Sequence, residues 1–322
     1  MIDFDMDQNE PPFTFRAVQN FVAAVEAQSV TRAAHLLGTS PSSVSQQLTA
    51  LETSLGARLI ERTARQFRLT RAGELFLEPA KAILDDVGAA KVRLALADQT
   101  PPLSLRIASL EELDATVTAP WLLRLANRFP KAALSLTSGA SHENHDALST
   151  RAVDMTLAVD TVAKVDWVER HPILRDPFIL VTAKDASPDL TTAPFIRYEQ
   201  NLQIGRQIEA HLRRAGPAPT RGFAFSTNQA MFAMTAELRG WAVTTALAYL
   251  GTPLAHELIT PQPLHTPRFS RQLELHARAD ALGDLPTIIA GDLRACIADR
   301  ILPEATTRLA FLGDDMQIIQ KT

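Results

Sequence analysis

The stretch TRAAHLLGTSPSSVSQQLTALE, residues 31–52, decides the fold of the first part of this chain. A short helical pattern, which Ser29 can cap and which contains Ala33 and Ala34, stops at Gly38. A second pattern starts at Ser40-Pro41, a hydroxyl cap followed by proline at the first helical position, where the missing N–H costs nothing. Two helices joined by a glycine-containing turn, with small residues where they approach each other, predict a helix-turn-helix.

The second of these helices has one apolar side and one polar, uncharged side. Its core stripe is Val44, Leu48, Leu51 and Leu55, and its opposite side presents hydroxyl and amide groups. Such groups can bond to base edges in a DNA major groove. An ordinary solvated helix surface has the same pattern, so the neighbouring charges must decide between the two interpretations. The residues expected to read bases are Ser42, Ser45, Gln46 and Thr49.

The charges around this motif favour DNA. The whole chain has a net charge of −4. Residues 1–10 are acidic, but residues 11–71 carry seven arginines against three glutamates. After Gly56, the segments RLIER and FRLT predict two short strands of a basic hairpin with its tip at 63–66. Arginines contact DNA phosphates, which gives affinity but little sequence information. The expected backbone contacts are Arg32, Arg58, Arg62 and Arg65.

Residues 71–98 predict one long helix that Thr70 can cap and that ends before Pro101-Pro102. Its apolar residues alternate at steps of four and three, which is typical of a helix that pairs with another helix. Pro79 removes one backbone hydrogen bond, and we expect a kink there.

From residue 103 onward, short apolar runs alternate with helical patterns, which predicts a mostly parallel α/β sheet in two lobes with a cleft between them. The predicted domains are a DNA-binding domain at 13–70, a linker helix at 71–98 and an α/β domain at 103–300. Lobe I is placed at about 103–160 and 268–300, and lobe II at about 161–267.

Several kinds of site are not expected. The single cysteine, Cys296, excludes an internal disulfide and reads as a buried small residue. The HENH segment at 142–145 has no third ligand at a recognisable spacing, so it predicts a polar helix start and no metal site. We expect no cofactor. Neither a secretory signal nor a membrane helix is recognisable, which makes the cytoplasm the expected location.

The residues from Phe21 to Leu84 resemble the LysR-type transcriptional regulators. The similarity is carried by specific motifs at the family's spacing, Ser29-x-Thr31-x-Ala33-Ala34, Leu51-Glu52 and Leu69-Thr70-x-Ala72-Gly73. Three later segments, RFP at 128–130, RAVDMTLAVD at 151–160 and GWAVTTALAYL at 240–250, are similar more loosely. The resemblance covers most of residues 15–300.

This resemblance implies a winged helix-turn-helix, a linker helix that dimerises, and a two-lobed domain like periplasmic binding proteins that holds a small effector. It also implies assembly as a dimer or tetramer, and a regulator without catalytic activity. The chain departs from the family at Ser40-Pro41-Ser42-Ser43, where Ser-Gln-Pro-Ala is common, and at Gln46, where Arg is frequent. The DNA sequence that it binds therefore cannot be transferred from the family.

The effector is expected beyond the carboxyl ends of strands and at helix N-termini, where free N–H groups favour anions. Arg197 can bind a carboxylate through its fork, which would suit an anionic effector, or it can form an ordinary ion pair. The expected contacts are Ser109, Ser141, Arg197, Tyr198, Asn201, Thr227 and Thr245.

Two other functional classes remain open from the residues alone. An enzyme on an α/β scaffold would usually show a local motif, and none of the G-x-G-x-x-G, G-x-x-x-x-G-K, H-E-x-x-H or G-x-S-x-G patterns occurs. A catalytic triad needs no such motif, so this class is only disfavoured. A solute-binding protein is disfavoured by the missing signal peptide.

Overall fold

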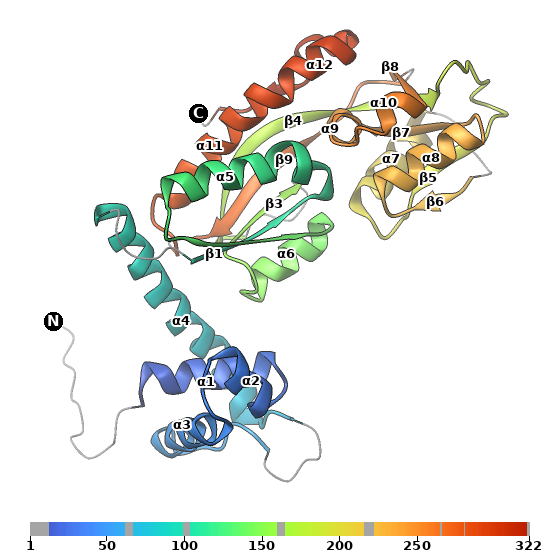
Figure 1. Ribbon diagram of the computed structural model, residues 1–322. Coiled ribbons are helices and arrows are strands. Elements are labelled where there is room, and N and C mark those ends of the chain that lie inside the picture. The colour runs from blue at the N-terminus through green and yellow to red at the C-terminus, as the bar shows by residue number, and fades with distance from the viewer. Residues whose placement is uncertain are drawn as a thin grey trace. The chain divides into compact units, whose positions relative to one another are not determined.

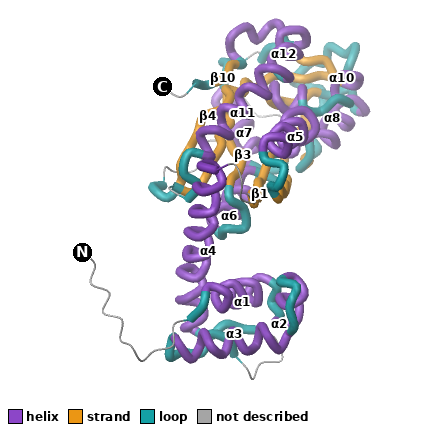
Figure 2. Tube along the Cα trace, turned by 60° about the vertical axis from the view of Figure 1, so that its left-hand side comes forward, coloured by secondary structure: helices purple, strands orange, loops and turns teal. Residues whose placement is uncertain are grey.

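The computed structural model describes residues 13–61, 67–98, 104–159, 165–215, 222–264, 266–279 and 281–320. The chain divides between Lys91 and Val92 into two compact units, which are described separately below. Figure 1 labels the elements of both units, and Figure 2 colours them by secondary structure.

The smaller unit is built from helices. They are α1 (Phe15–Glu26), α2 (Val30–Leu36), α3 (Pro41–Ser54) and the first part of α4 (Arg71–Asp98). The caps predicted at Ser29 and Ser40 are present, because their hydroxyls accept hydrogen bonds from Arg32 N and Ser43 N. Thr14 caps α1 in the same way.

The turn between α2 and α3 requires its glycine. Gly38 has φ 60°, a left-handed conformation that favours glycine. There the N–H of Thr39 bonds back to the carbonyl of Ala34 at 2.9 Å, which closes the C-terminus of α2. The predicted helix-turn-helix is therefore confirmed.

The predicted hairpin after Gly56 is present only in part. Among the described residues it consists of a single antiparallel bridge between Ile60 and Leu69, and Figure 2 accordingly draws no strand in this unit. Residues 62–66 lie outside the described residues, and with them the expected phosphate contacts Arg62 and Arg65.

The start of α4 packs directly on this bridge. Thr70 caps the helix, because its hydroxyl accepts from Gly73 N at 3.1 Å and donates to the carbonyl of Arg58 at 2.5 Å. A Cβ at Gly73 would lie 2.1 Å from the carbonyl oxygen of Leu59, so only glycine fits there. The helix continues through Pro79 to Asp98 as one element.

The larger unit is organised around one sheet in the strand order β2-β1-β3-β9-β4-β7-β5-β6, with β8 and β10 also paired to β4. The strands are β1 (Ser104–Ser109), β2 (Ala133–Ser138), β3 (Met155–Val159), β4 (Val168–Ala183), β5 (Phe195–Tyr198), β6 (Ala224–Phe225), β7 (Trp241–Thr245), β8 (Ile259–Gln262), β9 (Ser270–Arg278) and β10 (Gln317–Ile318).

Helices cover both faces of this sheet. They are η1 (Glu111–Leu113), the π-helix η2 (Asp114–Thr118), α5 (Ala119–Arg128), α6 (Ser141–Ser149), α7 (Gln203–Ala215), α8 (Asn228–Glu237), α9 (Ala246–Leu250), α10 (Ala255–Leu258), α11 (Leu285–Arg300), α12 (Leu302–Arg308) and η3 (Ala310–Asp315). Alternation along β1 shows the two layers: Ile107 belongs to the large core with α11, while Ala108 packs with Leu148 of α6 on the other face.

The sheet has two halves that are joined by long antiparallel strands. β1, β2 and β3 are parallel to one another in the first half, and β5, β6 and β7 in the second. β4 pairs with β9 up to Pro177, with β7 from Phe178 and with β8 from Leu180. The expected mostly parallel sheet is thus correct within each half but wrong where β4 and β9 cross. The change of partner lies at Pro177–Phe178, whereas the sequence placed a lobe boundary near residue 160.

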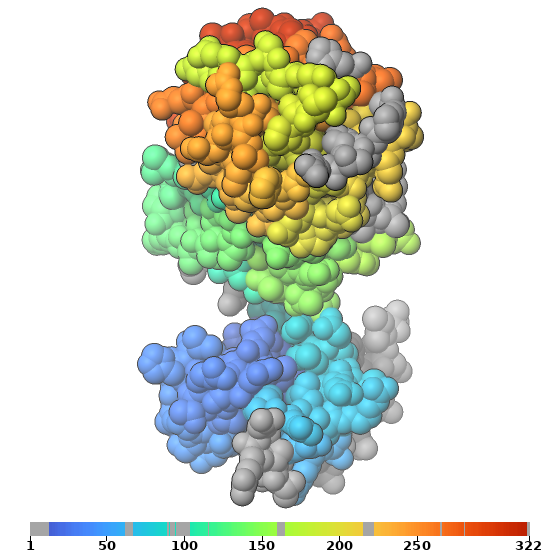
Figure 3. Space-filling view, turned by 90° about the vertical axis from the view of Figure 1, so that its right-hand side faces the viewer, coloured from blue at the N-terminus to red at the C-terminus, as the bar shows by residue number. Residues whose placement is uncertain are grey.

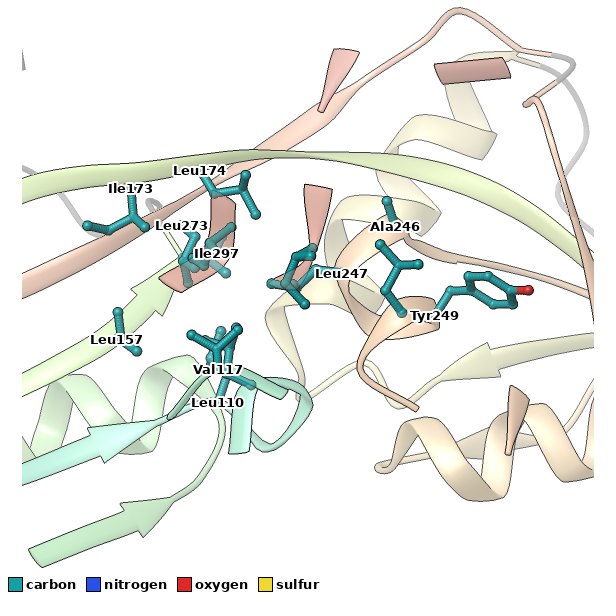
Figure 4. Close-up of a cluster of buried hydrophobic side chains, with 14 of the residues drawn as sticks. Leu110, Val117, Leu157, Ile173, Leu174, Ala246, Leu247, Tyr249, Leu273 and Ile297 are labelled. Carbon is teal, nitrogen blue, oxygen red and sulfur yellow. The ribbon is translucent and has the colours of Figure 1, made fainter. Parts of the chain in front are cut away.

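One apolar core extends through the larger unit. Figure 4 shows Leu174 of β4, Leu273 of β9 and Ile297 of α11 close together, with Leu247 of α9 beside them. Figure 3 faces the second half of the sheet, whose residues are coloured yellow to orange. The described segment after Pro303 contains the rest of α12, η3 and β10, and β10 pairs with β4. Among the described residues, no helix is long and apolar enough to cross a membrane.

Candidate functional site

The outer side of α3 presents the predicted base-reading residues to solvent. Ser42, Ser45, Gln46 and Thr49 are all exposed. The opposite side is fixed, because Val44 and Leu51 are fully buried in the core of the smaller unit. The apolar stripe therefore holds the helix while its polar side stays accessible.

The four exposed side chains differ in how free they are. The hydroxyl of Ser42 lies 2.9 Å from that of Ser40, and the hydroxyl of Thr49 donates to the carbonyl of Ser45 at 2.9 Å. Among the described residues, the side chains of Ser45 and Gln46 make no hydrogen bond. Gln46 thus has both a donor and an acceptor that no described residue occupies, the pair that recognises adenine.

Two of the predicted phosphate contacts lie on the described surface. Arg32 on α2 and Arg58 after α3 are exposed, and neither takes part in an ion pair with any described residue. Their charge is therefore available to an outside anion.

The buried carboxylate of Glu52 connects α3 to the bridge that follows it. One oxygen, Oε1, accepts from the backbone N–H groups of Leu59 at 2.8 Å and Ile60 at 3.1 Å. Because Glu52 is only 8% exposed, these bonds are shielded from water and hold the segment that follows Arg58 against α3.

A cavity of about 420 Å³ lies in the larger unit, beyond the carboxyl ends of strands from both halves. The first half contributes residues that follow β1 and β2, and the second half contributes the start of α7 and the segment before α8. The position agrees with the site expected for a ligand of an open α/β sheet.

The structure brings only some of the predicted effector residues to this cavity. Ser141, Tyr198 and Asn201 line it. Ser109 is buried and lies 3.0 Å from the hydroxyl of Thr118. Arg197 faces Glu209, with 3.1 Å between Nη1 and Oε1.

The two remaining predicted residues, both threonines, are helix caps. Thr227 accepts from Ala230 N at 3.4 Å at the start of α8, and Thr245 accepts from Ala248 N at 3.2 Å at the start of α9. Thr245 also accepts from Nη2 of Arg271, which does line the cavity.

Arg271 is the central charged group of the site and was not predicted. Its Nε donates to Asp176 at 2.8 Å, and its Nη2 donates to Glu112 at 2.7 Å. Burial alone would lower the pKa of this guanidinium, but the neighbouring carboxylates of Asp176 and Glu112 raise it. Asp176 also accepts from Leu247 N at 2.9 Å, so this group ties the start of β9 to η1, β4 and α9.

Tyr198 forms a second buried polar contact at the cavity wall. Its hydroxyl donates to Asn228 Oδ1 at 2.6 Å and lies 2.7 Å from the hydroxyl of Thr244. Burial raises the pKa of this phenol, so Tyr198 stays protonated and acts as a donor.

Asn144 of α6 links three segments of the first half of the sheet. Its Nδ2 group donates to the carbonyls of Ser109 at 2.9 Å, Gly139 at 3.3 Å and Leu157 at 3.3 Å. One side chain of α6 thus joins β1, the end of β2 and β3. The HENH segment is a polar helix start, as predicted, and Glu143 caps it by accepting from Ala140 N at 2.8 Å.

Sequence reasoning missed several lining residues, chiefly Arg271, Glu111, Glu112 and Gln207. Glu111 and Glu112 follow β1 directly after Leu110, so the same rule that selected Ser109 had the signal to find them. Arg271 and Gln207 had no such signal, because neither follows the carboxyl end of a strand.

Cys296 is buried, as predicted, and its thiol points to the carbonyl of Val117 at 3.6 Å. Burial raises the pKa of this thiol, which keeps it protonated and unreactive. No group of histidine, cysteine and acidic residues that could hold a metal is present in the described part of the chain.

Comparisons with known proteins match both units. A family model described as "Bacterial regulatory helix-turn-helix protein, lysR family" matches residues 15–74, and one described as "LysR substrate binding domain" matches residues 98–286. An HTH-type transcriptional repressor of Pseudomonas aeruginosa (strain UCBPP-PA14) is 32% identical over 155 residues, 48% of either protein. The chain spans about half the length of the curated relatives it matches first.

Solved structures share the fold. A full-length OxyR variant from Pseudomonas aeruginosa superposes with a TM-score of 0.67 at 20% identity, covering 89% of this chain and 96% of that one. Full-length CbnR complexed with its target DNA superposes with a TM-score of 0.56 at 21% identity, covering 89% of this chain and 99% of that one.

Proposed function

The chain belongs to the LysR family, and on this basis we propose that it is a DNA-binding transcriptional regulator that responds to a small molecule. It acts in the cytoplasm, on double-stranded DNA, through binding equilibria and without a catalytic step. The DNA-binding domain is residues 13–70, the linker helix residues 71–98 and the effector domain residues 103–300.

The observation that carries this proposal is the outer side of α3. Gln46 and Ser45 are exposed on a helix whose inner side is fully buried, and their side chains make no hydrogen bond to a described residue. Arg32 and Arg58, which make no ion pair with a described residue, lie on the same unit. In a major groove, Gln46 would bond an adenine edge, with Ser42, Ser45 and Thr49 beside it. Arg32, Arg58, Arg62 and Arg65 would contact phosphates and set the register.

Helix α4 supports self-association. Leu94 lies in the four-and-three series of apolar residues on this helix, and it is 60% exposed although its side chain is large and apolar. A second copy of α4 would cover it, as that spacing predicts. A dimer then presents two copies of α3 to two half-sites of DNA.

The cavity of the larger unit is the proposed effector site. Ser141, Tyr198 and Asn201 line it, and Thr245 reaches it through Arg271. If the two halves can adopt two arrangements and the effector binds one of them more tightly, the effector shifts the population toward that arrangement. The DNA-binding units would respond to this shift.

The test is a selection of bound fragments from random and genomic duplex DNA with the purified full chain, followed by footprinting. We expect an inverted repeat with half-sites about one helical turn, or a multiple of it, apart. The Gln46→Ala variant should recover a more degenerate site, while Gln19→Ala, which changes an exposed glutamine of α1, should recover the original one. No enrichment at moderate salt, with or without small molecules, contradicts the proposal.

A further inference from the structure

The charges that line the cavity are unbalanced. Three glutamates, Glu111, Glu112 and Glu143, face it, and Arg271 is the single lysine or arginine among its described lining residues. From this imbalance and from the bonds around it, we propose that the effector carries an amine or amidine cation, and that Glu111 and Glu112 bind it. This inference rests on the proposed function, since it names the ligand class of the same cavity.

Arg271 is already neutralised. Its Nε and Nη2 atoms are bonded to the carboxylates of Asp176 and Glu112, and its side chain is 6% exposed. A ligand carboxylate at Arg271 would have to approach these two carboxylates at short range in a site shielded from water, where like charges repel strongly. Arg197, the residue expected to bind an anion, is paired with Glu209 and does not line the cavity.

Glu111 and Glu112 have the opposite property. Glu111 is exposed and makes no ion pair with any described residue. Glu112 uses Oε1 for Arg271, and in the described part of the chain Oε2 makes no hydrogen bond. Both residues also line an adjoining cavity of about 220 Å³, so they form a wall that a ligand reaches from two sides. Their oxygens accept charge-assisted hydrogen bonds from an ammonium group.

The wall formed by α7 gives a second, independent indication that a polar ligand belongs here. Gln203 Nε2 and Gln207 Oε1 are buried atoms of the cavity lining that have no hydrogen-bond partner among the described residues. Buried polar atoms are normally satisfied, so these two point to a missing partner in the cavity. Gln207 Oε1 is an acceptor, like the two glutamates, so an amine can donate to all three, while Gln203 Nε2 is a donor and needs an acceptor elsewhere on the ligand.

The cation would also act on the link between the halves. Glu112 would be shared between the ligand and Arg271, and Arg271 also holds Asp176 of β4 and Thr245 at the end of β7. Binding of a cation at Glu112 weakens its bond to Arg271, which changes the contact between η1 and the crossing strands. Occupancy of the cavity is in this way coupled to the arrangement of the two halves.

The test uses the full chain and two series of probes, each with an amine, an alcohol and an acid on a similar carbon skeleton. The first series is putrescine, butanediol and succinate, and the second is benzylamine, benzyl alcohol and benzoate. Binding is measured by titration calorimetry and by the shift of the unfolding temperature. We expect at least one amine to bind about tenfold or more tightly than its alcohol and its acid, the effect of about one charge-assisted hydrogen bond. The proposal is overturned if neither amine binds more tightly than its alcohol, or if an acid binds most tightly.

Two variants distinguish binding at Glu111 from a general effect of the protein's negative charge. Glu111→Gln keeps an exposed side chain of the same shape and should weaken the amine about tenfold or more, whereas Glu237→Gln, on the exposed side of α8, should leave it unchanged. Equal loss in both variants counts against the site. Footprinting on the selected DNA runs in parallel, so amine binding without DNA binding would refute the proposed function alone, and DNA binding without amine preference would refute this inference alone.

Discussion

Arg271 and Asp176 form a buried ion pair at the point where the two halves of the sheet meet. Arg271 Nε lies 2.8 Å from Asp176 Oδ2, and the two side chains are 6% and 0% exposed. They face each other across the antiparallel β4 and β9, where Asp176 is in register with Arg271. The same guanidinium lines the cavity of about 420 Å³, so one pair serves both the packing of the halves and the wall of the cavity.

Breaking this pair should destabilise the larger unit strongly. Arg271→Gln leaves the carboxylate of Asp176 buried without its counter-charge, and the loss of unfolding free energy is expected to be about 3–5 kcal/mol. Urea unfolding of the full chain measures it. The double variant Asp176→Asn/Arg271→Gln should recover part of the loss, because the fully buried charge of Asp176 is then removed and only Glu112, 12% exposed, has lost its partner. A double variant less stable than either single variant contradicts this account.

Gln46 and Arg58 should differ in the kind of DNA contact that they lose. Gln46→Ala should cost about 1–3 kcal/mol at the preferred site and relax the preference at one position, because a base contact is removed. Arg58→Ala, and likewise Arg62→Ala, should lower the affinity for all DNA sequences alike. Each should also reduce the slope of log K against log salt concentration by about 1, the loss of one phosphate contact. Binding titrations on matched and mismatched duplexes at several salt concentrations distinguish the two. A uniform loss for Gln46→Ala would remove it from the base-reading set.

Two glycines of α4 provide a matched pair for the packing of this helix. A Cβ at Gly73 meets the carbonyl oxygen of Leu59 at 2.1 Å, whereas a Cβ at Gly88 meets nothing within 4 Å. Gly73→Ala should therefore destabilise the smaller unit, because α4 must move away from the bridge that follows α3. Gly88→Ala should stabilise the helix by about 0.5–1 kcal/mol through reduced backbone entropy. Thermal unfolding followed by circular dichroism tests both, and equal effects would contradict the close approach at Gly73.

Acid should destabilise the larger unit before its carboxylates titrate. Burial is the largest cause that lowers the pKa of His145, His211 and His256 below the ordinary 6.5. The unfolded chain then binds more protons than the folded one as pH falls through 6.5, so the unfolding free energy falls with it. Urea unfolding at pH 7.5, 6.5 and 5.5 should show this loss. His145→Gln should reduce the slope, and a stability that is flat over this range refutes the interpretation.

The sequence was most informative where local signals and packing agree. Ser29, Gly38 and Ser40-Pro41 mark helix ends by their own chemistry, so α2 and α3 could be predicted to within a residue or two. The apolar stripe of α3 fixed its orientation as well, and its exposed residues followed. These elements depend on neighbours a few positions away in the chain.

The crossing strands and the charged part of the cavity depend on distant partners. β4 contains Pro172 and Pro177, which count against a strand, and its register shifts between Pro172 and Leu174. Arg271 lies in a charged segment that reads as surface, because its partners Asp176 and Glu112 are far away in the chain. The expectation that Arg197 binds the effector rested on residue type and loop position, and neither indicates that Glu209 is already opposite it.

The continuity of β4 limits how the two halves of the larger unit can move relative to each other. Its sixteen residues run without a break from one half into the other. Where β4 changes its pairing partner from β9 to β7, the ring of Phe178 stacks on that of Phe269, with 4.0 Å between the ring centroids. A strand that is hydrogen-bonded along its length in both halves keeps them together while its twist can still change. We therefore expect the two arrangements to differ in the angle between the halves, and not in whether the halves separate.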